Sequence, residues 1–298
     1  MSMAPAFLIL NGKKASEPTI RDAVTQLRDE GINLQVRVTW EFGDCHRFIK
    51  EAIAARCSTL IVGGGDGSLN EAVNSLMQFS ADQRPPLAVL PLGTANDFAT
   101  SVGIPQEPEA ALRLALTATA HPIDLACVNQ QHYFINMATG GFGTRITTET
   151  PEKLKSALGG ASYILHGLLR MDRLKPDSCT ITSEQWQWQG DALVIAVGNG
   201  RIAGGGQRLC PTALINDQQL ALTIITAQEV LPSLLHALTR DDENPNIINQ
   251  RASEFTLTSE HTMTFNLDGE PYSGTRFHFN VLGEAIRFRL PSPCTLLG

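Results

Sequence analysis

The residue types best suited to chemistry form a glycine-rich turn at Gly63–Glu71, with the sequence Gly-Gly-Gly-Asp-Gly-Ser-Leu-Asn-Glu. An apolar run, Thr59–Val62, precedes this turn, and apolar residues at helical spacing follow it as far as Met77. We therefore predict a buried strand, a turn and a helix. Glycines let backbone N–H groups approach a ligand closely, and a helix N-terminus adds partial positive charge, so the turn suits phosphate. The carboxylate of Asp66 would repel phosphate unless a metal ion lay between them, which indicates a nucleotide bound with Mg²⁺.

The turn matches neither of two common phosphate-binding patterns. No Gly-Lys-Ser/Thr closes it, as a Walker A loop requires, and Ser68 stands where the dinucleotide fingerprint has its third glycine. A tight strand–helix connection without a ligand is therefore the alternative.

A second turn with polar residues, Pro91–Phe98, follows another apolar run. Gly93 permits a tight bend, and Thr94 offers a hydroxyl group. Asn96 and Asp97 are suited to cap the next helix, and capping alone would explain them. Because neighbouring parallel strands end at the same edge of a sheet, we expect the two turns to face each other across one crevice.

A third candidate is the acidic turn Asn266–Pro271, between two strand-like runs. Its Asp-Gly pair is a hairpin signal, so the acids could simply be solvated. The alternative is that Asp268 and Glu270 reach the phosphate site. A carboxylate there could accept the proton of an attacking hydroxyl group.

Strands and helices alternate in the first part of the chain, which predicts a parallel α/β sheet with helices on both faces. Thr39, the glycine turn and Gly93–Asp97 would all lie at strand ends, where such sheets bind ligands. The expected strands are Ala6–Leu10, Leu34–Thr39, Thr59–Val62 and Leu87–Leu90, and the expected helices are Pro18–Glu30, Asp44–Arg56, Leu69–Met77 and Glu109–Ala118.

The pattern changes near residue 120 to short segments of alternating polarity, which is typical of half-buried antiparallel strands. We predict an α/β domain over 1–122 and a β-sandwich or barrel-like domain over 123–298, with the extreme C-terminus packing back on the first. Helical insertions are expected at Ala161–Arg173 and Val230–Leu238. The expected strands are Tyr133–Asn136, Thr180–Thr182, Ala192–Val197, Leu220–Thr226, Phe255–Thr258, Met263–Leu267, Arg276–Leu282 and Ile286–Leu290.

Composition narrows the class of protein. A net charge of −7 over 298 residues argues against a general nucleic-acid binder and means that any membrane contact must use a local patch. The six cysteines are widely spaced, which favours free thiols in a cytosolic protein over disulfides or zinc ligands. No apolar run approaches the length of a membrane span. We expect a cytoplasmic protein with at most transient peripheral contact with the inner membrane, of unspecified oligomeric state.

Three strings, in this order, resemble the diacylglycerol-kinase catalytic family, and most closely its bacterial YegS-type lipid kinases. They are Gly64–Ser68 with Asn70 and Glu71, then Pro-Leu-Gly-Thr-Ala-Asn-Asp-Phe-Ala at Pro91–Ala99, then Asp-Gly-Glu at Asp268–Glu270. The resemblance covers essentially the whole chain. The Gly93–Ala99 string is specific to these lipid kinases, whereas NAD kinases and phosphofructokinases share the glycine turn.

The resemblance implies an ATP-dependent kinase that phosphorylates a hydroxyl group of a membrane lipid, resembling phosphatidylglycerol or diacylglycerol. The implied fold is a phosphofructokinase- or NAD-kinase-like nucleotide-binding domain followed by a β-sandwich lipid-substrate domain, with the active site in the cleft between them. Glu270 would be the general base, and Asp66 and Asp97 would help to hold Mg²⁺ and phosphate. The implied ATP-binding residues are Thr39, Gly65, Asp66, Gly67, Ser68, Leu69, Asn70, Glu71 and Thr94.

The family also has a structural cation site, which would map here to Leu214, Asp217 and Gln219, with Mg²⁺ or Ca²⁺ as the cation. Two departures bear on these implications. Ser68 replaces the usual Thr but keeps the hydroxyl group, and Gln218 stands after Asp217 where the family often has Gly. If that Gly serves a left-handed turn, the cation loop is in doubt.

Two other functions fit part of the sequence. An NAD kinase would share the glycine turn but would not explain Gly93–Ala99. A nucleotide-binding module without catalysis would have no need of Glu270 and the two aspartates.

Overall fold

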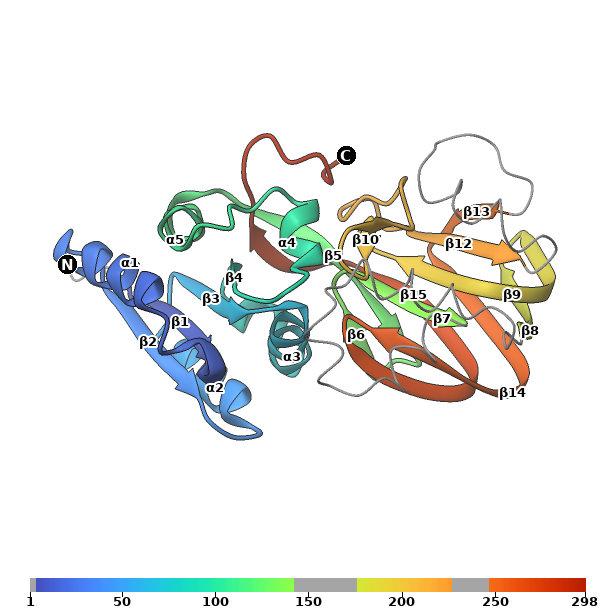
Figure 1. Ribbon diagram of the computed structural model, residues 1–298, viewed down its shortest axis with the longest axis horizontal. Coiled ribbons are helices and arrows are strands. Elements are labelled where there is room, and N and C mark those ends of the chain that lie inside the picture. The colour runs from blue at the N-terminus through green and yellow to red at the C-terminus, as the bar shows by residue number, and fades with distance from the viewer. Residues whose placement is uncertain (1–3, 142–175, 227–246) are drawn as a thin grey trace. The chain divides into compact units, whose positions relative to one another are not determined.

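The computed structural model describes residues 4–141, 176–226 and 247–298 (Figure 1). The helical insertions expected at Ala161–Arg173 and Val230–Leu238 lie outside these residues. The chain divides into two compact units, and each is described by itself. Unit 1 comprises Met1–Ile123 and Glu284–Leu297, and unit 2 comprises Asp124–Gly283 and Gly298.

Unit 1 is built on parallel strands in the order β2-β1-β3-β4. Every residue of β3 and β4 is buried, as expected for central strands with helices on both faces, whereas the edge strand β2 is mostly half-buried. The strands are β1 (Ala6–Asn11), β2 (Leu34–Thr39), β3 (Thr59–Gly64) and β4 (Leu87–Pro91). The last residues of β15 (Glu270–Arg289) belong to unit 1, and there Phe288 pairs in parallel with Leu87.

The helices of unit 1 pack in two pairs, α1 with α5 and α2 with α3. The chain runs outward from β1 to β2 and then back past β1 to β3, and right-handed crossovers place the helices of these two directions on opposite faces. The strand order therefore reverses between β1 and β3, and ligands of open α/β sheets bind beyond the carboxyl ends at such a point. The helices are α1 (Pro18–Asp29), α2 (Asp44–Ala54), α3 (Asp66–Leu76), α4 (Asp97–Ser101) and α5 (Pro108–Thr117), with 3₁₀ turns η1 (Gly12–Lys14) and η2 (Ala81–Gln83).

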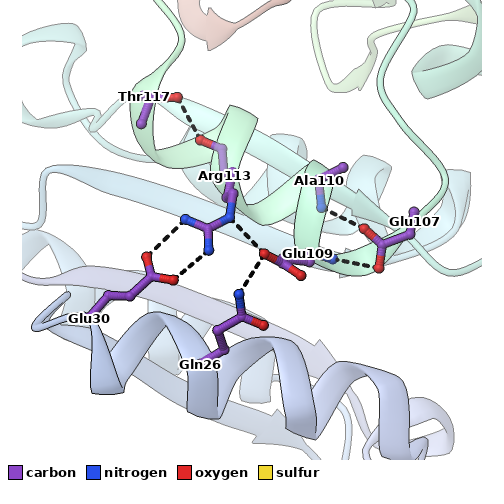
Figure 2. Close-up of polar contacts among 7 residues, drawn as sticks. All are labelled: Gln26, Glu30, Glu107, Glu109, Ala110, Arg113 and Thr117. Carbon is purple, nitrogen blue, oxygen red and sulfur yellow. Dashed lines mark hydrogen bonds and ion pairs between the residues drawn. The ribbon is translucent and has the colours of Figure 1, made fainter.

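A polar network holds α1 against α5 (Figure 2). The guanidinium of Arg113 forms two parallel hydrogen bonds with the carboxylate of Glu30, at 2.5 and 2.9 Å, and its Nε donates to Glu109 at 2.8 Å. The same Glu109 oxygen accepts a hydrogen bond from Gln26 Nε2 at 2.8 Å. The carboxylate of Glu107 caps α5 by accepting from two backbone N–H groups of its first turn. These contacts orient the pair of helices that covers one face of the sheet.

All eight elements predicted for unit 1 are present, with boundaries that shift by at most three residues. The structure has one further helix, α4, which the sequence did not predict and which follows directly on the second polar turn. Five residues give too few apolar repeats for a helical period to be recognised.

Unit 2 consists of antiparallel strands around a core of phenylalanines. The rings of Phe265 and Phe277 lie 4.7 Å apart, and those of Phe265 and Phe279 lie 5.2 Å apart. The strands are β5 (Ala120–Val128), β6 (His132–Phe134), β7 (Met137–Gly141), β8 (Asp177–Ser183), β9 (Trp186–Gly198), β10 (Ile202–Ala203), β11 (Gln207–Arg208), β12 (Leu220–Thr226), β13 (Ile247–Ala252), β14 (Glu254–Leu267) and β15 (Glu270–Arg289).

The predicted strands are shorter than the observed ones at the C-terminal hairpin. The runs Phe255–Thr258 and Met263–Leu267 belong to one strand, β14, whose register shifts between Thr258 and Met263. A shift of this kind interrupts the alternation of polar and apolar residues, so the sequence alone divides the strand in two.

Candidate active site

The glycine turn and the second polar turn are in direct contact. β3 ends at Gly64, and Gly65 precedes the first residue of α3 with an extended backbone. A Cβ atom on Gly93 would lie 2.5 Å from Gly65 Cα, so no larger side chain fits between the two backbones. The N–H of Leu92 also donates to the carbonyl of Gly64 at 2.8 Å. The prediction that these turns lie together is confirmed, but they pack backbone to backbone instead of facing each other across a crevice.

The carboxylate of Asp66 joins the two turns. It accepts hydrogen bonds from the N–H groups of Asp97 at 3.1 Å and Phe98 at 3.2 Å, at the beginning of α4. Asp66 is half-buried, and each of its oxygens keeps further lone-pair capacity. It is therefore both a structural link and an acceptor that a hydrated Mg²⁺ could still use.

Asn96 has a different role from the one predicted. It precedes α4 with a φ of 50°, but its side chain makes no capping bond to that helix. Instead its Oδ1 accepts from Gly93 N–H at 2.8 Å, and its Nδ2 donates to the Gly93 carbonyl at 3.0 Å. The expectation that Asn96 caps the helix is wrong, because Asp66 supplies the cap from the other turn. Asn96 closes the Gly93 turn on itself, and Asp97 is buried beside it.

The remaining predicted nucleotide-binding residues of α3 differ in what they can offer. Ser68 is half-buried and its Oγ accepts a hydrogen bond from Asn11 Nδ2 at 3.2 Å. Leu69 and Asn70 are buried, so Leu69 can meet a ligand only through its backbone. The side chain of Glu71 is exposed.

The threonines of the candidate site lie at two further strand ends. Thr39 is the half-buried last residue of β2, and Thr94 is exposed in the turn after β4. Because β2, β3 and β4 are parallel to β1 or to each other, their carboxyl ends lie at one edge of the sheet. That edge presents hydroxyl groups and backbone N–H donors together.

The end of β1 also belongs to this edge, which the sequence reading missed. β1 lies between β2 and β3, and its last residue, Asn11, contacts Ser68 of the glycine turn. Asn11 Oδ1 also accepts from Lys13 N–H at 3.0 Å and so orders η1. The signal in the sequence is the Asn11-Gly12-Lys13 string directly after the apolar run Ala6–Leu10, because an Asn-Gly pair marks a turn.

In the third candidate turn, which lies in unit 2, the two acids have different surroundings. Asp268 and Gly269 have φ values of 50° and 110°, and Leu267 pairs with Glu270 across them, so the Asp-Gly hairpin prediction is confirmed. Asp268 is buried, and its carboxylate accepts from the N–H groups of Ile135 at 2.7 Å and Met137 at 2.8 Å, and from that of Asn136 between them. Asp268 is therefore not a solvated acid. Glu270 is exposed at the start of β15.

The predicted cation ligands lie in a loop of unit 2 before β12. Asp217 Oδ1 accepts from Gln219 N–H at 3.1 Å, and Asp217 Oδ2 forms an ion pair with Arg251. Because the guanidinium of Arg251 already pairs with this carboxylate, a cation bound by Asp217 would have to displace it. Within the described ranges no group of three His, Cys, Asp or Glu side chains could hold a metal ion.

Gln218 adopts a left-handed backbone conformation, although it stands where the family often has Gly. Its φ is 57°, and its N–H donates to the buried carboxylate of Asp124 at 2.7 Å. Left-handed backbone costs a non-glycine residue roughly 1–2 kcal/mol, which this charge-assisted hydrogen bond can offset. Asp124 is a further buried acid that the sequence reading did not identify.

Two family models match the chain. The model described as "Diacylglycerol kinase catalytic domain" matches residues 5–128, and the one described as "YegS C-terminal NAD kinase beta sandwich-like domain" matches residues 137–289. The chain is 58% identical over 298 residues to proteins named "Probable lipid kinase YegS" from Salmonella dublin, Salmonella typhimurium and Shigella flexneri, covering 100% of both chains.

Two solved structures are similar to this chain in fold. A crystal structure of a candidate diacylglycerol kinase from Bacillus anthracis strain Sterne superposes with a TM-score of 0.85 at 23% identity, covering 98% of this chain and 97% of that one. Another crystal structure, named as a diacylglycerol kinase from the same strain, superposes with a TM-score of 0.76 at 22% identity and covers 97% of both chains.

Proposed function

Because the chain belongs to the diacylglycerol kinase catalytic domain family, we propose that it transfers the γ-phosphoryl group of ATP to a hydroxyl group of a membrane lipid, such as phosphatidylglycerol or diacylglycerol. The observation that supports this proposal best is the contact between the Gly65 and Gly93 backbones at the carboxyl ends of β3 and β4. This contact places the glycine turn, which suits phosphate, against the Gly93–Ala99 string, which is specific to lipid kinases.

In this proposal the residues at the sheet edge bind ATP. The first intrahelical bond of α3 runs from Leu69 N–H to the Gly65 carbonyl, so the N–H groups of Gly65–Ser68 have no acceptor within the helix. They take the phosphates, since such donors and the helix dipole favour negative charge there. The hydroxyl groups of Thr39, Ser68 and Thr94 are additional donors. These contacts hold the terminal phosphate in place for an in-line attack.

Asp66 and Asp97 suit a Mg²⁺ ion that is bound mainly by the phosphates. Mg²⁺ keeps several waters and usually takes only one or two carboxylates from a protein, so a cluster of three acids is not needed. Bound in this way, Mg²⁺ would neutralise the charge that develops on the phosphoryl oxygens.

Glu270 is the proposed general base. Its carboxylate accepts the proton of the lipid hydroxyl as that oxygen forms a bond to the γ-phosphorus, while the bond from the γ-phosphorus to the bridging oxygen breaks and ADP leaves. The Asp-Gly-Glu string and the exposure of Glu270 at the end of a rigid hairpin support this assignment. No step in this mechanism uses a cation at Asp217, so the site at Leu214, Asp217 and Gln219 stays a prediction.

The experiment that tests the proposal follows label from [γ-³²P]ATP with two acceptors, a total bacterial lipid extract and NAD. A lipid kinase makes labelled product that partitions into organic solvent. Label on NAD stays in water and would favour the NAD-kinase alternative. Binding of Mg²⁺–ATP without transfer to either acceptor would favour a nucleotide-binding module.

A further inference from the structure

Three apolar side chains stand in solvent at the end of β2 and in the loop that follows it. Among the described residues three large apolar side chains are exposed, and all three lie within five residues: Val38 at 39%, Trp40 at 93% and Phe42 at 102%. Single exposed apolar residues are normal, but a concentration of this kind marks a surface that contacts something other than water. We call Val38, Trp40 and Phe42 the aromatic tip.

The backbone of the aromatic tip is held in place and is not a frayed end. The N–H groups of Trp40 and Glu41 donate to Asp44 Oδ2 at 2.7 and 3.1 Å, and Asp44 N–H donates back to the Glu41 carbonyl at 3.2 Å. Arg47 forms an ion pair with Asp44 at 2.5 Å and lies over the Phe48 ring at 4.3 Å. These bonds order the backbone of the loop from which the Trp40 and Phe42 side chains project into solvent.

Basic residues lie beside this tip. Gly12 packs against the end of β2, because a Cβ atom on it would lie 2.3 Å from the Thr39 carbonyl oxygen. The next residue, Lys13, is exposed, and Arg47 has 64% of its side chain exposed. Aromatic rings flanked by cations suit the headgroup layer of a bilayer, where Trp is enriched and cations meet anionic lipids.

We infer that the aromatic tip inserts into the headgroup region of a phospholipid bilayer. This choice of occupant rests on the proposed function, because a lipid kinase must reach acceptors in a membrane, and no helix in the described parts of the chain could cross one. A second copy of the chain is the weaker choice. Two aromatic side chains bury about 300–500 Å², whereas a stable interface needs about 800 Å² on each partner.

Insertion here has a consequence for the reaction. Thr39 ends the strand that leads into the aromatic tip, and the glycine turn lies at the same edge of the sheet. Docking through Trp40 and Phe42 would thus bring the phosphate-binding edge of unit 1 toward the membrane surface.

The test uses the emission of Trp40, which can be isolated because the chain contains three tryptophans. The W186F/W188F variant, in which Trp40 is the remaining tryptophan, is mixed with vesicles of equal parts phosphatidylcholine and phosphatidylglycerol. We expect the emission of Trp40 to move to shorter wavelength when vesicles are added. The apparent affinity of the protein for these vesicles should fall about tenfold in Phe42→Ser. The matched control is Glu41→Ser, which removes an exposed acid between the two rings and should bind these anionic vesicles at least as tightly.

Three results would overturn the inference. The first is that Trp40 emission does not change with vesicles. The second is that Phe42→Ser and Glu41→Ser lose equal amounts of vesicle affinity. The third is that Trp40 emission responds to Mg²⁺–ATP or to protein concentration but not to vesicles. The last would assign the tip to the nucleotide base or to a second copy.

An activity assay separates this inference from the proposed function. Phe42→Ser should lose about tenfold in turnover of acceptor in vesicles at limiting lipid but keep its turnover of a short-chain acceptor dissolved in water. Equal losses with both acceptors would contradict the docking role. If no variant phosphorylates either acceptor although Trp40 still responds to vesicles, the proposed function fails and the docking surface stands.

Discussion

Asp268 and Glu270 lie two residues apart in one hairpin, yet the structure gives them opposite surroundings. Asp268 is buried and accepts hydrogen bonds from backbone N–H groups of the 135–137 segment, whereas Glu270 is exposed. A buried carboxylate with such partners stabilises the fold, and an exposed one is available to accept a proton. The two acids can therefore be separated by experiment.

Glu270→Gln should lower kcat about 10²–10⁴-fold, because the amide cannot accept the proton of the lipid hydroxyl. The free energy of unfolding should stay within about 0.5 kcal/mol of the parent, as is usual for exposed positions. Initial rates of lipid phosphorylation and urea unfolding curves measure the two quantities. The matched control is Glu260→Gln, an exposed acid on β14, which should keep full turnover. Equal rates in Glu270→Gln and the parent would remove Glu270 from the mechanism.

Asp268→Asn, unlike Glu270→Gln, should lower the free energy of unfolding. The amide group replaces one acceptor oxygen with a donor that faces backbone N–H groups, so at least one buried N–H loses its partner. We expect the free energy of unfolding to fall by roughly 1–3 kcal/mol. Urea unfolding at neutral pH would measure the change, and a variant as stable as Glu270→Gln would show that the bonds to Ile135 and Met137 contribute little.

Asp66 is a less suitable target for testing metal binding than its sequence suggests. Its carboxylate accepts from Asp97 and Phe98 N–H, so Asp66→Asn disturbs the junction of the two turns as well as any bound Mg²⁺. Loss of turnover in that variant would not separate the two roles.

At the scale of elements, the contact between the two turns depends on the absence of two side chains. Gly93→Ala would place a Cβ atom 2.5 Å from Gly65 Cα and 2.8 Å from Asn96 Oδ1. We expect the turns to separate at a cost of about 1–3 kcal/mol. Gly67→Ala is the control, because nothing lies within 4 Å of its Cβ position in α3, and helix propensity makes Ala neutral or slightly stabilising there. Thermal unfolding of both variants checks the pair, and similar melting temperatures would contradict the account.

The loop between β2 and α2 should respond to acid through Asp44. The ion pair with Arg47 and the N–H groups of Trp40 and Glu41 lower the pKa of Asp44 to about 2. A pKa lowered by folding stabilises the protein above the unfolded value, near 4, and that stabilisation is lost as the pH falls toward 2. The stability difference between the parent and Asp44→Asn should therefore be constant above about pH 4 and shrink below it. Urea unfolding over this range measures it, and a difference that persists at pH 2 would contradict the assignment.

For the whole molecule, the sequence was sufficient where a feature depends on local pattern. The buried strands β1, β3 and β4, the amphipathic helices and the Asp-Gly hairpin follow from periodicity and turn chemistry alone. Features that depend on contacts between distant segments were not predicted. The burial of Asp268 requires N–H groups more than 130 positions away, and the cap of α4 requires Asp66 from the preceding turn.

The exposure of Trp40 and Phe42 could not be predicted from the sequence either. Trp40 and Phe42 continue the alternation of β2, and only the edge position of that strand and the Asp44 contacts show that they stand in solvent. The roles assigned to Thr39, Thr94 and Glu270 as ligands or base are proposals, because they depend on substrates.

The measurement that tests the central claim most directly is mass analysis of a total bacterial lipid extract after incubation with the protein and Mg²⁺–ATP. We predict that a lipid with a free hydroxyl group gains one phosphate, in amounts that equal the ADP formed, and that Glu270→Gln gives almost none. ADP formation without any phosphorylated lipid, or phosphate found only on a water-soluble acceptor, would contradict the account.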